Sequence, residues 1–170
     1  SHRRRFRTKL ISMRMCGYDR VLVEPSGIYD VDEFFDVLRE EPLDQWYEIG
    51  NVIAILDARL ENNLSQQADY LLASEAANAG KVILSHADAA TREQCEDTVA
   101  HLNRALEQIR CDRRIDPEKD ILQINLTDLT KEDLEEVSKC GYRLESYRKM
   151  DLENDQTFDS LFFMEEKSRC

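Results

Sequence analysis

The sequence predicts an α/β fold with a parallel sheet and helices on both of its faces. Short apolar runs without polar alternation occur four times, and amphipathic stretches lie between them. Unbroken apolar runs of this length are typical of strands buried on both faces, which belong to parallel sheets. Strands that alternate with helices are joined by right-handed crossovers. The second observation is that polar residues follow each run. This fits the same fold class, since ligands bind beyond the carboxyl ends of the strands in such sheets.

Composition narrows the class of protein. The chain has 170 residues, of which 42% are hydrophobic and 34% charged, and its formal net charge is −12. A surface this acidic argues against a nucleic-acid partner, whose phosphates need basic residues. The one basic cluster, Arg3–Arg5 with Arg7, is interpreted as a solvated helix face. No apolar run approaches the roughly 20 residues that span a bilayer, and no signal peptide is visible, so no membrane partner is expected.

The cysteines and histidines give no sign of a disulfide framework or a metal centre. The five cysteines are scattered and form no C-x-x-C pair, which favours a reducing cytoplasm. His2, His86 and His101 are not spaced as metal ligands. We therefore expect no transition-metal site within this chain.

The first helix and strand precede a conspicuous carboxylate. Apolar residues at i, i+4 and i+7 predict a helix over Arg3–Cys16, and Arg20–Val23 is expected to be a buried strand. Glu24 ends that strand before Pro25-Ser26-Gly27 breaks the chain. A carboxylate at this position can hold a water on Mg²⁺ or polarise an attacking water. The alternative is a glutamate that only ends the strand.

The next two units follow the same pattern. Val31–Glu40 is predicted to be a helix with one apolar stripe, started by Asp30 and Glu33 and ended before Pro42. The second strand, Asn51–Leu56, ends at Asp57. A helix over Leu64–Asn78 follows, with Ser65 as its expected N-cap.

The last two units complete the sheet. Lys81–Leu84 is the third strand, and Ser85-His86-Ala87-Asp88 follows it. Thr91 and Gln94 predict a capping box for a helix that reaches Ile109. Ile121–Ile124 is the fourth strand and ends in Asn125; the helix after Thr130 is expected to turn Leu134 and Val137 inward, and Leu161–Met164 could add another strand.

Polar residues at the strand ends should converge, since the carboxyl ends of parallel strands share one edge. The group comprises Glu24, Asp57, residues 85–88 and Asn125. Such a rim predicts a nucleotide or phosphate site, with a plain scaffold as the alternative.

The order of these motifs resembles the CobW family. A buried strand with E-x-x-G (Glu24–Gly27), a strand with Asp57-Ala58 and a strand with Ser85–Asp88 follow one another as in those P-loop GTPases, which are related to nickel and cobalt maturation GTPases. The family acts in cobalamin biosynthesis and in the delivery of zinc or other metals. The resemblance implies a three-layer P-loop NTPase fold, with 1–150 as the later part of a GTPase-like domain. Residues 151–170 would be a linker and the start of a C-terminal domain that the chain does not include.

The resemblance also implies roles for particular residues. Glu24 would be the Walker-B-type acid that organises Mg²⁺ and the attacking water, and Gly27 would let the backbone approach the γ-phosphate. Asp88 would accept hydrogen bonds from guanine, while Ser85 and His86 stand where the family has Asn and Lys. Ser26 and Asp57 would support the rim.

Two family motifs do not occur in the sequence. There is no G-x-x-x-x-G-K-[ST] phosphate loop and no C-x-C-C metal motif. In the family both lie upstream of E-x-x-G, and the chain begins Ser1-His2 without Met. We therefore expect a fragment of a GTPase that uses GTP and Mg²⁺ to handle a zinc or cobalt cargo for a client metalloprotein or in cofactor maturation. The chain alone should be inactive as a hydrolase.

Other interpretations stay open. One is a nucleotide-free α/β scaffold that acts through protein–protein contact, which the altered Ser85-His86 pair favours. A weaker one is a flavodoxin-like binding domain, although no phosphate loop follows its first strand. Without the central P-loop strand, neighbouring strand edges would be unpaired, so a homo-oligomer through these edges is expected.

Overall fold

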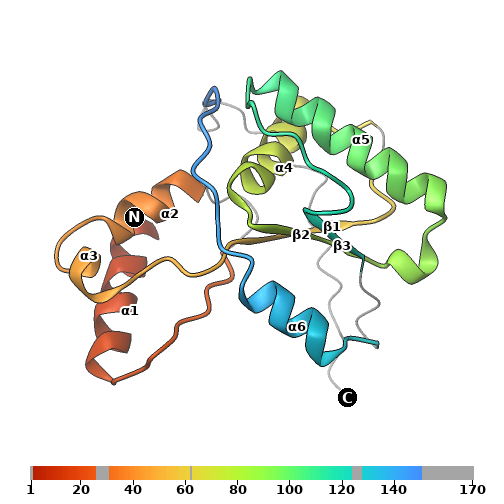
Figure 1. Ribbon diagram of the computed structural model, residues 1–170. Helices are drawn as coiled ribbons and strands as arrows, with labels where there is room; N and C mark the ends of the chain where they lie inside the picture. The colour runs from red at the N-terminus through yellow and green to blue at the C-terminus, as the bar shows by residue number, and fades with distance from the viewer. Residues whose placement is uncertain (1, 26–30, 62, 124–127, 151–170) are drawn as a thin grey trace, which may run out of the picture.

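The fold is described by a computed structural model that covers residues 2–25, 31–61, 63–123 and 128–150. Three N-terminal helices lie beside an α/β unit (Figure 1). The helical part contains α1 (His2–Met15), α2 (Val31–Leu38) and α3 (Leu43–Trp46). The α/β unit contains β1 (Ile53–Asp57), α4 (Gln66–Asn78), β2 (Lys81–Ser85), the 3-10 turn η1 (Ala87–Ala89), α5 (Arg92–Gln108), β3 (Ile121–Gln123) and α6 (Lys131–Ser138).

The sheet is parallel, as predicted. Its described strands have the order β1-β2-β3, so β2 is central. Asp57 on β1 is the partner of Ser85 on β2, and Val82 is the partner of Ile121 on β3. Helices α4 and α5 cover one face and α6 lies on the other side (Figure 1). The predicted fold class, an α/β fold with a parallel sheet and helices, is confirmed.

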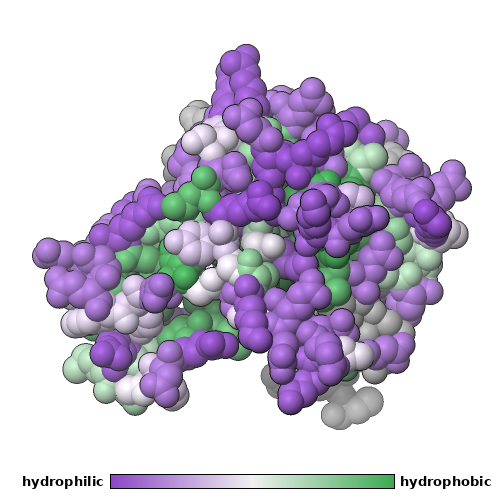
Figure 2. All heavy atoms as spheres, viewed as in Figure 1, coloured by the Kyte–Doolittle hydropathy of each residue, from purple (hydrophilic) through white to green (hydrophobic). Residues whose placement is uncertain are grey.

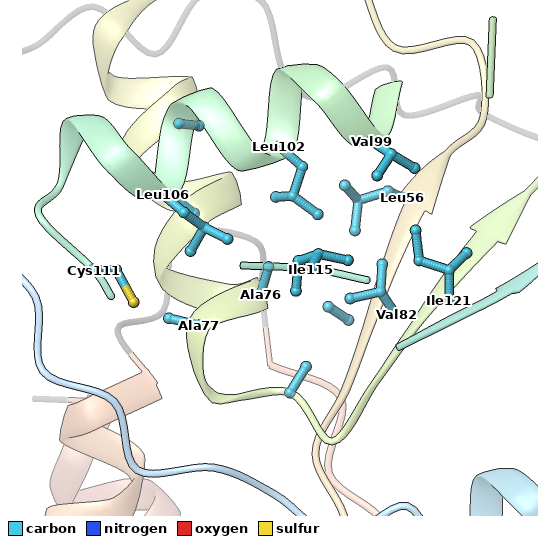
Figure 3. Packing of buried hydrophobic residues seen from close by; sticks show 14 of the residues in the cluster. Leu56, Ala76, Ala77, Val82, Val99, Leu102, Leu106, Cys111, Ile115 and Ile121 are labelled. Atoms are coloured by element: carbon cyan, nitrogen blue, oxygen red, sulfur yellow. The ribbon is translucent and has the colours of Figure 1, made fainter. Parts of the chain in front are cut away.

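The main core lies between the sheet and helices α4 and α5. Alternate strand residues point toward these helices, and Ile115, from the segment after α5, lies among them (Figure 3). Alanines at 73, 76 and 77 on α4 are completely buried, and their small side chains let the helix approach its neighbours closely. The labelled members of this cluster are Leu56, Ala76, Ala77, Val82, Val99, Leu102, Leu106, Cys111, Ile115 and Ile121.

The opposite face of the sheet is less covered. Ile55 on β1 is 67% exposed. Lys81 at the start of β2 forms an ion pair with Glu136, which ties α6 to this side. The expectation that Leu134 on α6 points inward is wrong, because its side chain is 56% exposed and Val137 is only half-buried. This ion pair and the hydrogen bond from the Asn51 side-chain amide to the Ser138 carbonyl at 2.7 Å, rather than an apolar stripe, hold this acidic helix.

The predicted helix starts are confirmed where they are described. The Ser65 hydroxyl accepts from the Ala68 amide at 3.2 Å. Thr91 and Gln94 form the expected capping box, and Thr130 forms another with Asp133. Each side-chain oxygen accepts from a backbone amide that the first helical turn leaves without a partner. The Asp30 cap, Asn125 and the Leu161–Met164 strand lie outside the described residues.

The predicted buried strand over Arg20–Val23 is wrong. Residues 20–25 belong to no strand, and Leu22 is 90% exposed. No backbone hydrogen bond joins them to the described sheet. Val21 packs instead against the core of the N-terminal helices. An apolar run becomes a sheet strand only when a neighbouring strand offers it a hydrogen-bonding edge. Residues 20–23 have no such neighbour among the described strands.

The N-terminal helices have a small core of their own. Leu10, Val37 and Leu43 are buried together, and the Tyr47 hydroxyl donates to the Leu10 carbonyl at 2.7 Å. Arg3 and Arg7 of the basic cluster pair with Glu40, so this cluster is partly a contact between α1 and the turn after α2 rather than only a solvated face. Figure 2 shows a mostly hydrophilic surface with apolar patches, several of them on the side of α1–α3.

Candidate functional site at the ends of β1 and β2

The predicted rim is present where β1 and β2 end. Asp57 and Ser85 are neighbours in register. The Ser85 hydroxyl donates to the Leu56 carbonyl at 3.0 Å, and the Ala58 amide donates to the Ser85 carbonyl at 2.9 Å. These bonds hold the two strand ends together, so the loops that follow them start from fixed positions.

Asp57 links the loop after β1 to the loop after β2. Its Oδ1 accepts from the Arg59 amide at 2.8 Å, and its Oδ2 lies 3.0 Å from His86 Nδ1. Burial alone would raise the pKa of the Asp57 carboxyl, but the hydrogen bonds from Arg59 and His86 outweigh burial and hold the pKa below its ordinary value. The carboxylate therefore stays ionised at neutral pH and accepts from both loops.

Asp88 is presented to solvent just beyond the central strand. It lies in η1, which starts after His86, and its side chain is exposed. Within the described residues it forms no hydrogen bond or ion pair. Its two carboxylate oxygens are therefore open to a ligand that offers donors, unlike those of Asp57.

A buried threonine that the sequence analysis did not single out supports this rim. The Thr98 hydroxyl on α5 donates to the Ala58 carbonyl at 2.9 Å and accepts from the Leu60 amide at 3.3 Å. The segment after β1 is thereby fixed to α5. Thr98 lies three residues after Cys95 and four before Leu102, on the buried face of α5, and this spacing was the available signal.

Other predicted site residues are not brought to this rim. Glu24 is exposed in the segment 20–25, which runs from α1 toward the chain that leads into β1, not toward the end of that strand (Figure 1). Its expected position at the end of a buried strand is therefore corrected, for the reason given for Arg20–Val23. Ser26 and Gly27 lie outside the described residues.

The described residues also limit which other groups could be held. They contain no cluster of three or more His, Cys, Asp or Glu side chains that could bind a metal ion. Two cavities lie away from the rim: one of about 250 Å³ between α2 and residues 144–149, and one of about 490 Å³ along α1. A search of the described residues for a helix able to cross a membrane found none.

A parallel sheet with polar groups at the carboxyl ends of its strands is the arrangement in which α/β domains bind ligands. A family model for the nucleotide-binding domain of CobW/HypB/UreG matches residues 4–115. The chain belongs to this family, as its strand-end motifs indicated. The matched segment includes most of α1, both β1 and β2, and the rim residues Asp57 and 85–88. Neither the curated proteins nor the solved structures yielded a match.

Proposed function

We propose that this chain carries the guanine-recognising part of a CobW-type GTP-binding protein. The family match supports binding of a nucleotide, and the exposed Asp88 after the central strand β2 is the observation that supports guanine. A carboxylate accepts the two parallel donors of guanine, its N1–H and its exocyclic amine. Adenine offers no such pair, so Asp88 would favour GTP over ATP.

The remaining roles concern the phosphates and the metal. The family resemblance, rather than the position of Glu24 in this structure, supports a role for Glu24 as the acid that holds Mg²⁺ through water, with Gly27 and Ser26 next to it in the chain. Ser85 and Asp57 are proposed to support the base loop. Mg²⁺ would neutralise phosphate charge when bound. The described residues supply no acidic cluster for Mg²⁺, so we assign no reaction step to it. GTP hydrolysis requires the phosphate loop that these 170 residues do not contain.

The wider function follows the family. We propose that GTP turnover is coupled to handling zinc or cobalt, as in cobalamin synthesis or delivery to a client metalloprotein, in the cytoplasm. We also propose the division at residue 150 between the GTPase-like domain and a C-terminal segment. Glu24→Gln tests the GTPase role in a longer form of the protein that contains a phosphate loop and hydrolyses GTP. The turnover should fall while the fold, followed by circular dichroism, stays unchanged.

Base recognition can be tested on the chain itself. ¹⁵N-labelled protein is titrated with GMP, AMP and XMP, which need no phosphate loop. GMP should shift the amide signals of residues 85–90, and AMP should do so more weakly. In Asp88→Asn the preference should move toward XMP, because the amide NH₂ can donate to the C2 carbonyl of xanthine. Amide signals at 85–90 that no nucleotide moves at millimolar concentration would contradict the proposal.

The rim itself favours a second candidate, a nucleotide-free scaffold. The Ser85 hydroxyl is bonded to β1 and His86 to Asp57, so two of the polar groups at the rim already have partners within the chain. A scaffold predicts that Asp88→Asn changes no nucleotide response. The same titration therefore separates the two candidates.

A further inference from the structure

We propose that Asp57 is a positioning residue that fixes the His86 ring as a stacking platform for a purine base. This inference rests on the proposed function and adds a residue pair to the base site. His86 occupies the second position of the four-residue stretch Ser85–Asp88, two residues before the proposed base reader. It is therefore close in the chain to wherever a base would lie on Asp88.

The orientation of His86 is fixed from two directions. Its backbone has the left-handed conformation, with φ 56° and ψ 27°, which residues other than glycine adopt uncommonly. Its carbonyl accepts from the Ala89 amide at 3.1 Å, and its ring Nδ1 lies 3.0 Å from Asp57 Oδ2. Because the ionised Asp57 can only accept, Nδ1 must carry the hydrogen. The ring is thus held in one tautomer and one direction.

What remains of the ring is available to a ligand. The His86 side chain is 60% exposed although its Nδ1 is bonded. Nε2 forms no hydrogen bond with another described residue. An aromatic ring that is rigid on one edge and open to solvent is suited to stack on a base, because little conformational freedom is lost on binding.

Stacking on His86 and hydrogen bonding to Asp88 would then contribute differently to binding of the base. Every base has a π-face, so a stacking ring raises affinity for purines without choosing between them. The choice falls on Asp88, whose carboxylate distinguishes guanine from adenine. His86→Ala should therefore weaken GMP and AMP to a similar extent, whereas changes at Asp88 should alter the preference between them.

The experiment combines a spectroscopic measurement with a double-mutant cycle. Long-range ¹H–¹⁵N spectra of the chain without ligand report the tautomer of His86, and we expect the form protonated at Nδ1. In titrations, His86→Ala should weaken both GMP and AMP roughly ten-fold. Asp57→Ala should weaken both about three-fold, and this effect should vanish in the Asp57→Ala/His86→Ala double variant, since Asp57 acts through His86.

Controls keep the outcomes separate. Asp97→Ala, on the exposed side of α5, should change no affinity. If Asp57→Ala fails to fold, Asp57→Asn keeps the shape but leaves one acceptor for Arg59 and His86 to share, and it should show the same direction of change. GMP binding that is unaffected by His86→Ala, or an Nε2-protonated tautomer, would overturn this inference and leave the Asp88 proposal standing. If neither GMP nor AMP binds at all, both proposals fail.

Discussion

The buried guanidinium of Arg113 donates from Nη1 to the main-chain carbonyl of Ala77 at 3.0 Å. The same nitrogen bonds the carbonyls of Ala76 and Ala79, and the Arg143 amide donates to the Asn78 carbonyl at 2.9 Å. The carbonyls of Ala77, Asn78 and Ala79 at the end of α4 are thus satisfied from outside the helix, whereas that of Ala76 also accepts from the Ala79 amide at 3.2 Å. A cation at this helix end also complements the helix dipole.

Removing Arg113 should therefore destabilise the fold strongly. Its burial lowers the pKa of the guanidinium, with nearby Arg143 acting in the same direction, but an arginine remains charged at neutral pH. Arg113→Met removes the arginine donor from the carbonyls of Ala77 and Ala79 and one of the two arginines beside Asp120, which Arg143 still contacts. We expect the free energy of unfolding to fall by about 3–5 kcal/mol, measured by urea denaturation.

The neighbouring residue provides a matched control for Arg113. Arg114 is exposed, and Arg114→Met should change stability by less than about 0.5 kcal/mol. Similar losses in the two variants would show that Arg113 does not cap α4.

Gly80 is required by a close approach of two backbone segments. A Cβ at this position would lie 2.2 Å from the Gly141 carbonyl oxygen and 2.4 Å from that of Cys140. The same Gly141 carbonyl accepts from the Val52 amide at 2.9 Å at the start of β1. Gly80→Ala must therefore push the 140–141 segment away from the sheet.

We expect Gly80→Ala to cost about 2–3 kcal/mol of stability and to speed hydrogen exchange at the Val52 amide. Gly50→Ala is the control, because nothing lies within 4 Å of a Cβ there. Unchanged exchange at Val52 in Gly80→Ala would show that the contact is not maintained in solution.

Much of the α/β unit could be predicted from local pattern. The β1 and β2 runs and the caps at Ser65, Thr91 and Thr130 each depend on residues close in the sequence, and the structure confirms them. The adjacency of Asp57 and Ser85 followed from the rule that parallel strands end at one edge.

The failures are those that depend on distant partners. The Arg20–Val23 run has strand composition, but nothing local reveals whether a neighbouring strand will pair with it. The same holds for Arg113, which reads as one charge in a polar link and is in fact buried against α4. The Asp57–His86 pair could be expected as proximity, but its hydrogen bond depends on the left-handed backbone at His86, which no pattern indicated.

Glu75 should make stability depend on pH. Burial on α4 raises the pKa of its carboxyl to about 7, from an ordinary value of 4.5. The folded state therefore binds this proton more tightly than the unfolded state does. Its contribution to stability is full below pH 4.5 and is lost as the pH rises to about 7, a loss of about 3 kcal/mol.

Glu75→Gln should remove this dependence. The stability difference between variant and wild type should grow in favour of the variant between pH 5 and pH 8, by an amount on the order of 2–3 kcal/mol. The exposed Glu107→Gln is the control and should show no such trend. If the difference in the free energy of unfolding between Glu75→Gln and wild type stays constant across this pH range, the pKa of the Glu75 carboxyl is not raised by folding.

Leu22 distinguishes the structure from the strand that the sequence predicted. Shortening a leucine in a strand buried on both faces lowers the free energy of unfolding by about 2–5 kcal/mol. At 90% exposure, however, Leu22 contributes almost no burial. Leu22→Ser should therefore change the free energy of unfolding by less than about 0.5 kcal/mol. Val82→Ala, completely buried on β2, should cost about 1–3 kcal/mol in the same urea titration and calibrates the measurement. A loss at Leu22 equal to that at Val82 would mean that residues 20–23 are buried in solution, and would restore the predicted position of Glu24 at the end of a buried strand.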